Sequence, residues 1–141
     1  MEAAIKNLKD AGLLDPEKLH QSETGTIAPR IISSRYYNQK ARKIRYFMDF
    51  FFADYQGSLE RMSREETTLL RGKLLNIRRL GDETVDSILL YSCNKPIFVV
   101  DAYTRRIFSR YGLIRENAAY GEIQHFFTEN LPKDIELFND F

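Results

Sequence analysis

The sequence contains no tryptophan, a single cysteine and almost no net charge. One cysteine, Cys93, cannot form a disulfide within the chain, and these 141 residues cannot supply a cysteine zinc site or a four-cysteine iron–sulfur cluster. A composition so poor in cysteine is typical of a reducing compartment, so we expect a cytoplasmic location. The net charge of +1 gives no overall field toward nucleic acid or membrane, so any basic surface must be local.

Long apolar runs are absent too. No stretch approaches the roughly 18 apolar residues of a membrane span, and no signal peptide is visible. We therefore expect no membrane association. The chain is 43% hydrophobic and 29% charged, which is ordinary for a globular protein, and its length favours one domain over residues 1–141.

Strand patterns are almost missing, and apolar residues recur at helical spacing in nearly every segment. Only residues 97–100 form a short apolar run, and because a helix-like stretch follows at once, we expect an extended connector there. Asn38 is predicted to cap a long helix, and Ser63 with Glu66 fits a capping box before the next one. The sequence therefore predicts an all-α bundle of about seven to nine helices.

Both ends of the chain interrupt a helical pattern. The first residues begin an amphipathic helix without a convincing cap, and the last apolar face still runs at Phe141. Natural termini usually end in polar residues. We therefore expect that further helices are missing at each end.

Residues 74–93 predict two helices joined by a four-residue hairpin. The free N–H groups and the dipole at the start of the second helix form an anion site suited to a phosphate. Such a contact reads only the backbone of a nucleic acid. The alternative is an ordinary αα-hairpin in a helical core.

The motif after this hairpin carries a family resemblance. A hairpin, an apolar connector with Pro96 and then "VVDAYTRR" resemble the endonuclease III superfamily of DNA glycosylases. The segments "YYNQKARKI", "AIKNLKDAGLLDPEKL" and "ENLPKDIELFNDF" add to the resemblance, which covers nearly all of the chain. The wording "DETVDSILLYS…PIFVVDAYTRRI" is most similar to the endonuclease III-related, 3-methyladenine-type subgroup.

This resemblance implies a partial helix–hairpin–helix glycosylase fold, namely the six-helix domain with part of the second lobe. The motif would span residues 66–93, whereas the N-terminal helix that wedges into DNA and the C-terminal helices would be missing. The implied function is repair of double-stranded DNA, by flipping out a damaged, alkylated base and hydrolysing its N-glycosidic bond. No metal or iron–sulfur cluster is implied, and the enzyme would act as a monomer in a prokaryotic cytoplasm, on the nucleoid.

The resemblance places the catalytic aspartate at Asp101, which would stabilise the cationic sugar in its ionised form. The alternative is a plain N-cap for the helix that begins at Ala102, and both roles are compatible. Glu83 stands where bifunctional members have a lysine that forms a Schiff base. Since a carboxylate cannot form that adduct, the resemblance implies a monofunctional enzyme without lyase activity. For Glu83 the alternative is a first-turn carboxylate favoured by the helix dipole.

Contacts with DNA are expected from the hairpin and from nearby cations, although a run of charges is more often a solvated face. The predicted DNA-binding residues are Arg78, Arg79, Leu80, Gly81, Asp82, Thr84, Lys40 and Arg105. Two features depart from the family pattern, because Arg79 and Arg35 stand where glycine is usual. Asp82 and Glu83 would also repel a nearby phosphate.

Three tyrosines, Tyr91, Tyr103 and Tyr111, could stack on a base, but their helical spacing favours core packing. Two further functions stay open beside the glycosylase. One is a truncated, non-catalytic remnant that binds DNA weakly through the hairpin, which Arg79 and Arg35 support. The other is a helical protein-interaction module unrelated to DNA.

Overall fold

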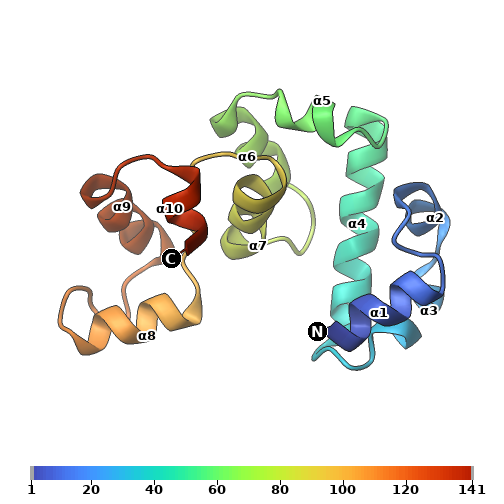
Figure 1. Ribbon diagram of the computed structural model, residues 1–141, viewed down its shortest axis with the longest axis horizontal. Helices are drawn as coiled ribbons and strands as arrows, with labels where there is room; N and C mark the ends of the chain where they lie inside the picture. Colours follow the sequence, from blue (N-terminus) through green and yellow to red (C-terminus); the bar gives the residue numbers. More distant parts are fainter. Residues whose placement is uncertain (1, 141) are drawn as a thin grey trace. The chain divides into compact units, whose positions relative to one another are not determined.

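The computed structural model describes residues 2–140, which are helical with no strand among them (Figure 1). The predicted continuation of the last apolar face to Phe141 lies outside the described residues. The chain divides into two compact units. The first runs up to Met62 and includes Ile77–Arg79, and the second comprises Ser63–Asn76 and the residues from Leu80 on.

The first unit packs short helices against one long helix. Its core contains Leu8, Ile27, Ile31 and Ala41, all less than a tenth exposed. Asp15 caps the second helix, because its carboxylate accepts from the N–H groups of Glu17 and Lys18. The helices are α1 (Glu2–Asp10), α2 (Pro16–Gln21), α3 (Thr24–Ile27), the 3-10 turn η1 (Ala28–Ile31), α4 (Tyr37–Tyr55) and α5 (Leu59–Ser63), whose last residue belongs to the second unit.

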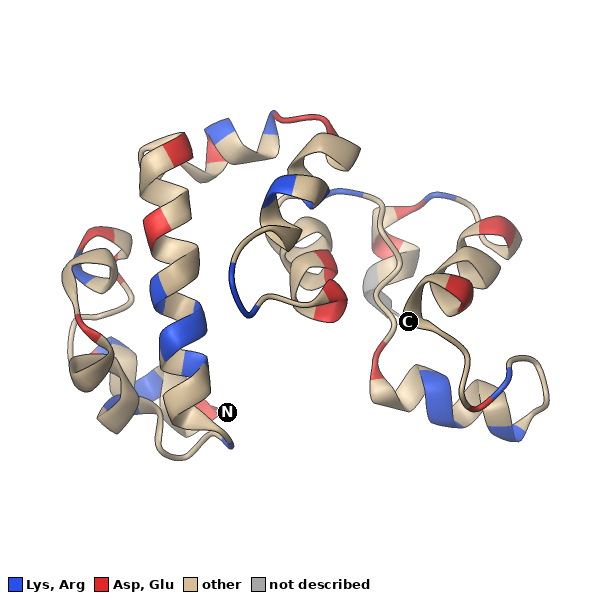
Figure 2. Cartoon of the chain, turned by 180° about the vertical axis from the view of Figure 1, so that it is seen from behind, with Lys and Arg blue, Asp and Glu red and all other residues tan. Residues whose placement is uncertain are grey.

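Helix α4 begins differently from the prediction. Asn38 lies inside the helix, and the residue before the first turn is Tyr36, which is left-handed with a φ of 56° and gives no side-chain cap. Arg35, which stands where the family usually has glycine, is not among the residues with positive φ. Figure 2 shows Lys and Arg along the first half of α4, where the chain places Lys40, Arg42, Lys43 and Arg45.

The second unit carries the hairpin and everything after it. Helix α6 packs against α7, and Leu70, Leu74, Val85 and Leu89 are fully buried. Leu69, which the sequence predicts to be buried, is 53% exposed. The elements are α6 (Thr67–Leu75), α7 (Asp82–Ser87), a π-helical continuation η2 (Ile88–Ser92), α8 (Ala102–Arg110), α9 (Tyr120–Asn130) and α10 (Ile135–Asp140).

The predicted capping box before α6 is wrong. Ser63 ends α5, and Glu66 is itself the N-cap of α6. Its two carboxylate oxygens accept from the N–H groups of Thr68 and Leu69 at 3.0 and 2.9 Å. These backbone hydrogen bonds stabilise the charged form and lower the pKa of Glu66.

The extended connector between η2 and α8 is present as the sequence predicts, with no regular structure over residues 94–101. Phe98 fixes it in the core, since it is 1% exposed, stacks on Phe127 at 4.4 Å and meets the edge of Phe138 at 5.6 Å. Val100 is also buried. The apolar run therefore holds the start of α8, and with it Asp101, against α9 and α10.

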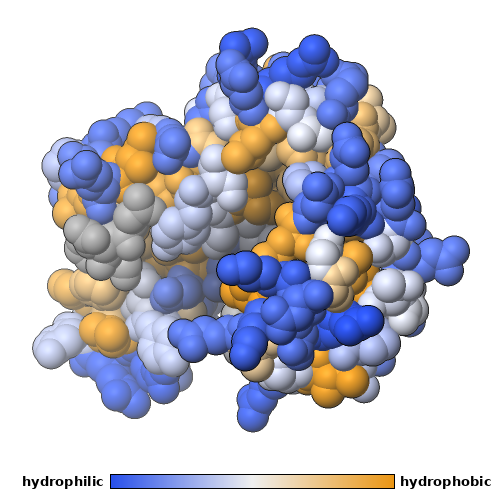
Figure 3. Space-filling model, turned by 45° about the vertical axis from the view of Figure 1, so that its right-hand side comes forward, coloured by the Kyte–Doolittle hydropathy of each residue, from blue (hydrophilic) through white to orange (hydrophobic). Residues whose placement is uncertain are grey.

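The surface mixes hydrophilic and apolar side chains. On the face shown in Figure 3, hydrophilic residues predominate and apolar areas lie between them. The expected core packing of three tyrosines is wrong, since Tyr91, Tyr103 and Tyr111 are 57%, 68% and 78% exposed. In α8 the face toward the core carries Thr104 and Phe108 instead. Among the described helices, none is both long and apolar enough to cross a membrane.

Candidate active site

A pocket of about 680 Å³ opens at the start of α8, within the second unit. It brings together residues from the connector, α7, α8 and the segment that leads into α9. Two carboxylates that the sequence singled out, Asp101 and Glu83, lie on its wall. The lining residues are Glu83, Val100, Asp101, Ala102, Arg105, Arg106, Ser109, Arg110, Glu116 and Tyr120.

Asp101 ends the connector in an extended conformation and caps α8, as predicted. Its Oδ1 accepts a hydrogen bond of 2.7 Å from the backbone N–H of Thr104. Within residues 2–140 no other group donates to this carboxylate, so Oδ2 keeps its capacity to accept. The side chain is partly exposed on the pocket wall. The cap therefore fixes the carboxylate and leaves one oxygen for a substrate.

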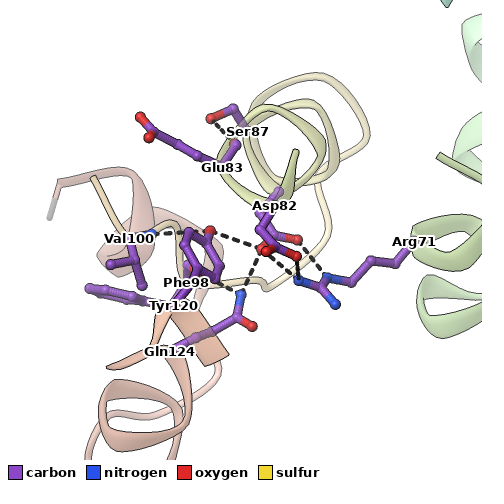
Figure 4. A network of polar contacts seen from close by, with 9 residues as sticks. Arg71, Asp82, Glu83, Ser87, Phe98, Val100, Tyr120 and Gln124 are labelled. Carbon is purple, nitrogen blue, oxygen red and sulfur yellow. Dashed lines mark hydrogen bonds and ion pairs between the residues drawn. The ribbon is translucent and has the colours of Figure 1, made fainter. Parts of the chain in front are cut away.

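Glu83 lies in the first turn of α7 and is exposed. None of the described residues forms an ion pair or a hydrogen bond with its carboxylate, and its backbone carbonyl accepts from the Ser87 hydroxyl at 2.7 Å. In Figure 4 its side chain points away from the Arg71 and Asp82 side chains. The pocket thus holds Asp101, whose carboxylate is bonded to a helix N-terminus, and Glu83, whose carboxylate is open to solvent.

Three arginines of α8 line the same pocket, but they are not equally available. The Arg105 guanidinium donates to the backbone carbonyls of Ala118 and Glu116, so it ties α8 to the loop before α9. Arg106 lies over the Tyr103 ring, with its guanidinium carbon 5.1 Å from the ring centroid. Arg106 and Arg110 are exposed, whereas Arg105 is partly buried. A polyanion would meet Arg106 and Arg110 more readily than the predicted Arg105.

The hairpin contains one residue in an unusual backbone conformation. Arg79 is left-handed, with a φ of 70°, at the position where the family usually has glycine. Gly81 is extended and precedes α7 without any side-chain cap. The Leu80 side chain is buried, so a contact from this residue would come from its backbone. Asp82 and Thr84 follow in the first turn of α7, exposed and partly exposed.

The other predicted DNA-binding cations belong to the first unit. The Arg78 guanidinium lies over the Tyr46 ring, 5.8 Å from its centroid, and Lys40 is partly exposed near the start of α4. The structure groups these two cations on one unit. It groups Asp101, Glu83 and Arg105 on the other.

A buried polar network beside the pocket was not predicted. Asp86, which is 0% exposed, is its centre. Figure 4 shows its partners Arg71, Tyr120 and Gln124. Its oxygens accept from Arg71 Nε at 2.8 Å, Arg71 Nη2 at 3.1 Å, Tyr120 Oη at 2.9 Å and Gln124 Nε2 at 2.8 Å. One feature of the sequence could have indicated this network. Asp86 lies on the apolar face of its helix with Leu89 and Leu90, where a charged residue is unusual.

The network fixes the protonation of its members. Burial raises the pKa of the Tyr120 phenol well above its usual range; the nearby Asp86 charge adds to this, and the Val100 N–H partly opposes it. The hydrogen bond to Asp86 raises the pKa of Arg71. A neutral phenol and a charged guanidinium therefore face Asp86.

No group of three or more His, Cys, Asp or Glu side chains placed to hold a metal ion occurs in the part of the chain that the structure describes. Cys93 is buried, and this burial raises the pKa of its thiol. The charged groups that line the pocket are carboxylates and arginines.

Comparison with known proteins adds a family. Residues 1–133 match the family described as HhH-GPD superfamily base excision DNA repair protein. A candidate DNA repair glycosylase of Methanocaldococcus jannaschii is 41% identical over 143 residues, which cover 100% of this chain and 64% of that protein. Endonuclease III of Sulfolobus acidocaldarius is 28% identical over 123 residues, 87% of this chain and 53% of that protein.

Solved structures share the fold. The H. pylori 3-methyladenine DNA glycosylase bound to 1,N6-ethenoadenine superposes with a TM-score of 0.81 at 30% identity, covering 98% of this chain and 63% of that one. A trapped endonuclease III–DNA covalent intermediate superposes with a TM-score of 0.73 at 19% identity. The match covers 94% of this chain and 60% of that one. The chain thus spans less than two thirds of the length of these relatives.

Proposed function

The chain belongs to the HhH-GPD superfamily of base excision DNA repair proteins, and on this basis we propose that it is a monofunctional DNA glycosylase. Its proposed substrate is double-stranded DNA with an alkylated base, whose N-glycosidic bond it hydrolyses. It acts as a monomer in the cytoplasm, on the nucleoid of a prokaryote, without a metal or an iron–sulfur cluster. The observation that carries the proposal is the Asp101 carboxylate, held at a pocket with one oxygen bonded and the other available.

Asp101 supplies the electrostatic part of the reaction. When the N-glycosidic bond breaks, positive charge develops on the sugar, and a fixed carboxylate stabilises that charge without first having to reorganise. The hydrogen bond from the Thr104 N–H holds the carboxylate in place, while Oδ2 faces the substrate or orients the attacking water. Bond cleavage followed by addition of water leaves an abasic site.

Glu83 supports the absence of a lyase step. It lines the pocket, at the position that the family resemblance gives to the Schiff-base lysine, and a carboxylate has no amine to attack the sugar. The alkylated base is supported by the similarity to a glycosylase that is named for 3-methyladenine and was solved with 1,N6-ethenoadenine.

DNA binding is assigned to the hairpin and to local cations. The extended Gly81 leaves the first N–H groups of α7 without a side-chain cap, as a phosphate contact requires. Positive charge is concentrated locally, although the net charge of the chain is only +1. One unit carries Arg78, Arg79 and Lys40, and the other carries Arg106 and Arg110.

The test is release of methylated purines from duplex DNA under single-turnover conditions, with the protein in excess. We expect base release from the wild type and a loss of at least about 100-fold in Asp101→Asn, since one preorganised electrostatic group contributes that much. Asparagine caps a helix as well as aspartate does, so this variant should stay folded. Alkali should convert the abasic sites to strand breaks.

Two results would contradict the proposal. Strand breaks before alkali would overturn the monofunctional mechanism. No release from a wild type with a helical circular dichroism spectrum would favour the second candidate function, a non-catalytic hairpin module that binds DNA. The left-handed Arg79 favours this second function.

A further inference from the structure

We infer that Tyr120, held by the buried Asp86, is a positioning residue for Asp101, and this inference rests on the proposed function of Asp101. Tyr120 lies at the start of α9 and contacts the connector one residue before Asp101. Its Oη donates to Asp86 Oδ2 at 2.9 Å and accepts from the Val100 N–H at 3.2 Å (Figure 4). The Tyr120 hydroxyl therefore links the buried Asp86 carboxylate to the backbone of Val100, the residue before Asp101.

The direction of these two bonds is fixed by chemistry. An ionised carboxylate only accepts hydrogen bonds, so the phenol proton must point to Asp86. The Tyr120 oxygen therefore acts as the acceptor for the Val100 N–H. Because Val100 is buried in an extended connector, its N–H would lose its only partner among the described residues without this hydroxyl.

A second tether runs through the same carboxylate. The Gln124 amide nitrogen donates to Asp86 Oδ2 at 2.8 Å and to the Phe98 carbonyl at 2.9 Å. The connector is thus held at Phe98 and at Val100 by two side chains of α9, both of which Asp86 orients. Immediately after these two points, the Thr104 N–H fixes Oδ1 of Asp101.

Arg71 completes the arrangement from the other side. Its guanidinium bonds both oxygens of Asp86 and also Asp82 Oδ1 at 3.3 Å, which compensates a charge that would be costly to bury alone. A tightly packed apolar cluster would fill the same volume but would not direct the connector backbone. Hydrogen bonds are directional, so this network sets the orientation of the peptide that carries Asp101.

The test compares Tyr120→Phe with Tyr111→Phe, a matched control whose side chain is 78% exposed. We expect Tyr120→Phe to slow single-turnover base release by about 10-fold to 100-fold, the range for outer-shell partners at metal sites, with an unchanged Kd for the DNA. The control should match the wild type in the rate of base release and in the Kd for the DNA. A purely structural role would lower the free energy of unfolding and leave the rate of the folded protein unchanged, and that result would overturn the inference.

A second readout does not depend on activity. Amide hydrogen exchange at Val100 should accelerate in Tyr120→Phe and not in Tyr111→Phe, and unchanged protection of Val100 would overturn the inference. An inactive wild type would overturn the proposed function, while exchange at Val100 would still decide whether the tether exists. If Tyr120→Phe does not fold, Gln124→Met removes the second tether and should slow base release. A wild-type rate of base release in this variant would also overturn the inference.

Discussion

Asp86 and Asp101 are two carboxylates of one unit with opposite surroundings. Asp86 is fully buried, and both of its oxygens accept hydrogen bonds from protein groups, namely Arg71, Tyr120 and Gln124. Asp101 is partly exposed and receives one backbone N–H. The Asp86 carboxylate is bonded to protein donors and orients these neighbours. The Asp101 carboxylate has one oxygen without a hydrogen bond, which can act on a substrate. The environment of each residue thus separates their roles.

Arg79 gives a prediction at the residue scale. Its left-handed conformation costs a side-chain-bearing residue roughly 1–2 kcal/mol, and glycine would relieve this cost at about 0.5–1 kcal/mol of added chain entropy. We expect Arg79→Gly to raise the free energy of unfolding by up to about 1 kcal/mol in urea denaturation. Arg78→Gly, at a position without positive φ, should lower it instead. A less stable Arg79→Gly would contradict the role assigned to backbone strain.

Cys93 gives a second prediction at this scale. Because the thiol is buried and its pKa is raised, little thiolate is available at mildly alkaline pH. We expect a disulfide reagent such as DTNB to modify the folded protein at least about 100-fold more slowly than the urea-unfolded chain, since reaction requires local opening. Equal rates for the folded and unfolded protein would show that the thiol is accessible.

At the scale of elements, the connector over residues 94–101 is the part on which the site depends. It has no regular hydrogen-bonded structure of its own, so side chains of other elements must hold it. Phe98 anchors it in the aromatic core, and two side chains of α9 bond its backbone. The backbone position of Asp101 is therefore set by the packing of the connector, while the N-terminus of α8 fixes its carboxylate.

The anchor can be tested directly. Phe98→Ala removes a buried ring that contacts Phe127 and Phe138, and such truncations cost about 3–5 kcal/mol. We expect a loss of that size in the free energy of unfolding. The matched control, Tyr103→Ala, removes a ring that is 68% exposed and should change it by less than about 1 kcal/mol. Similar losses in both variants would contradict the anchoring of the connector by Phe98.

The buried phenol of α9 predicts how stability depends on pH. Above about pH 10 the unfolded chain loses the Tyr120 proton, but the folded chain keeps it because its pKa is raised. The unfolded state is then favoured, so stability should fall as pH rises, by at most about 1.4 kcal/mol per pH unit from this residue. Urea titrations at alkaline pH should show a shallower fall in Tyr120→Phe than in the wild type. Tyr111→Phe should retain the wild-type slope, and the same slope in all three proteins would refute the assignment.

At the scale of the whole molecule, charge is nearly balanced overall but uneven locally. The chain carries 21 Lys and Arg against 20 Asp and Glu, so the proposed DNA binding would rely on clusters of cations and not on a general field. The two compact units each carry part of the proposed DNA-binding set. Binding strength should therefore respond to single cations.

Salt dependence tests this distribution. The logarithm of the binding constant for duplex DNA should fall linearly with the logarithm of salt concentration, with a slope of about −0.9 for each phosphate contacted. Lys40→Gln should weaken the slope by about 1, whereas Lys6→Gln, on the exposed surface of α1, should leave it unchanged. Affinity that does not depend on salt would favour the protein-interaction module over a DNA-binding protein.

Much of the fold could be predicted because its determinants are local. Apolar spacing predicted the helices, and Asp101 was identified as a cap. Where two local signals compete, the sequence was misleading. Glu66 caps α6 in place of Ser63, which ends α5, and Tyr36 precedes α4 in place of Asn38.

The sequence by itself determined the all-α class, the hairpin, the connector and the position of Asp101 at a helix start, since each depends on residues a few positions apart. Only the tertiary structure decided which side chains surround that position. Asp86 and Tyr120 are 34 residues apart in the chain, and nothing in local spacing indicates that they meet. Their contact depends on how α7 and α9 pack, because a buried charge acquires its partners only when the core has assembled around it.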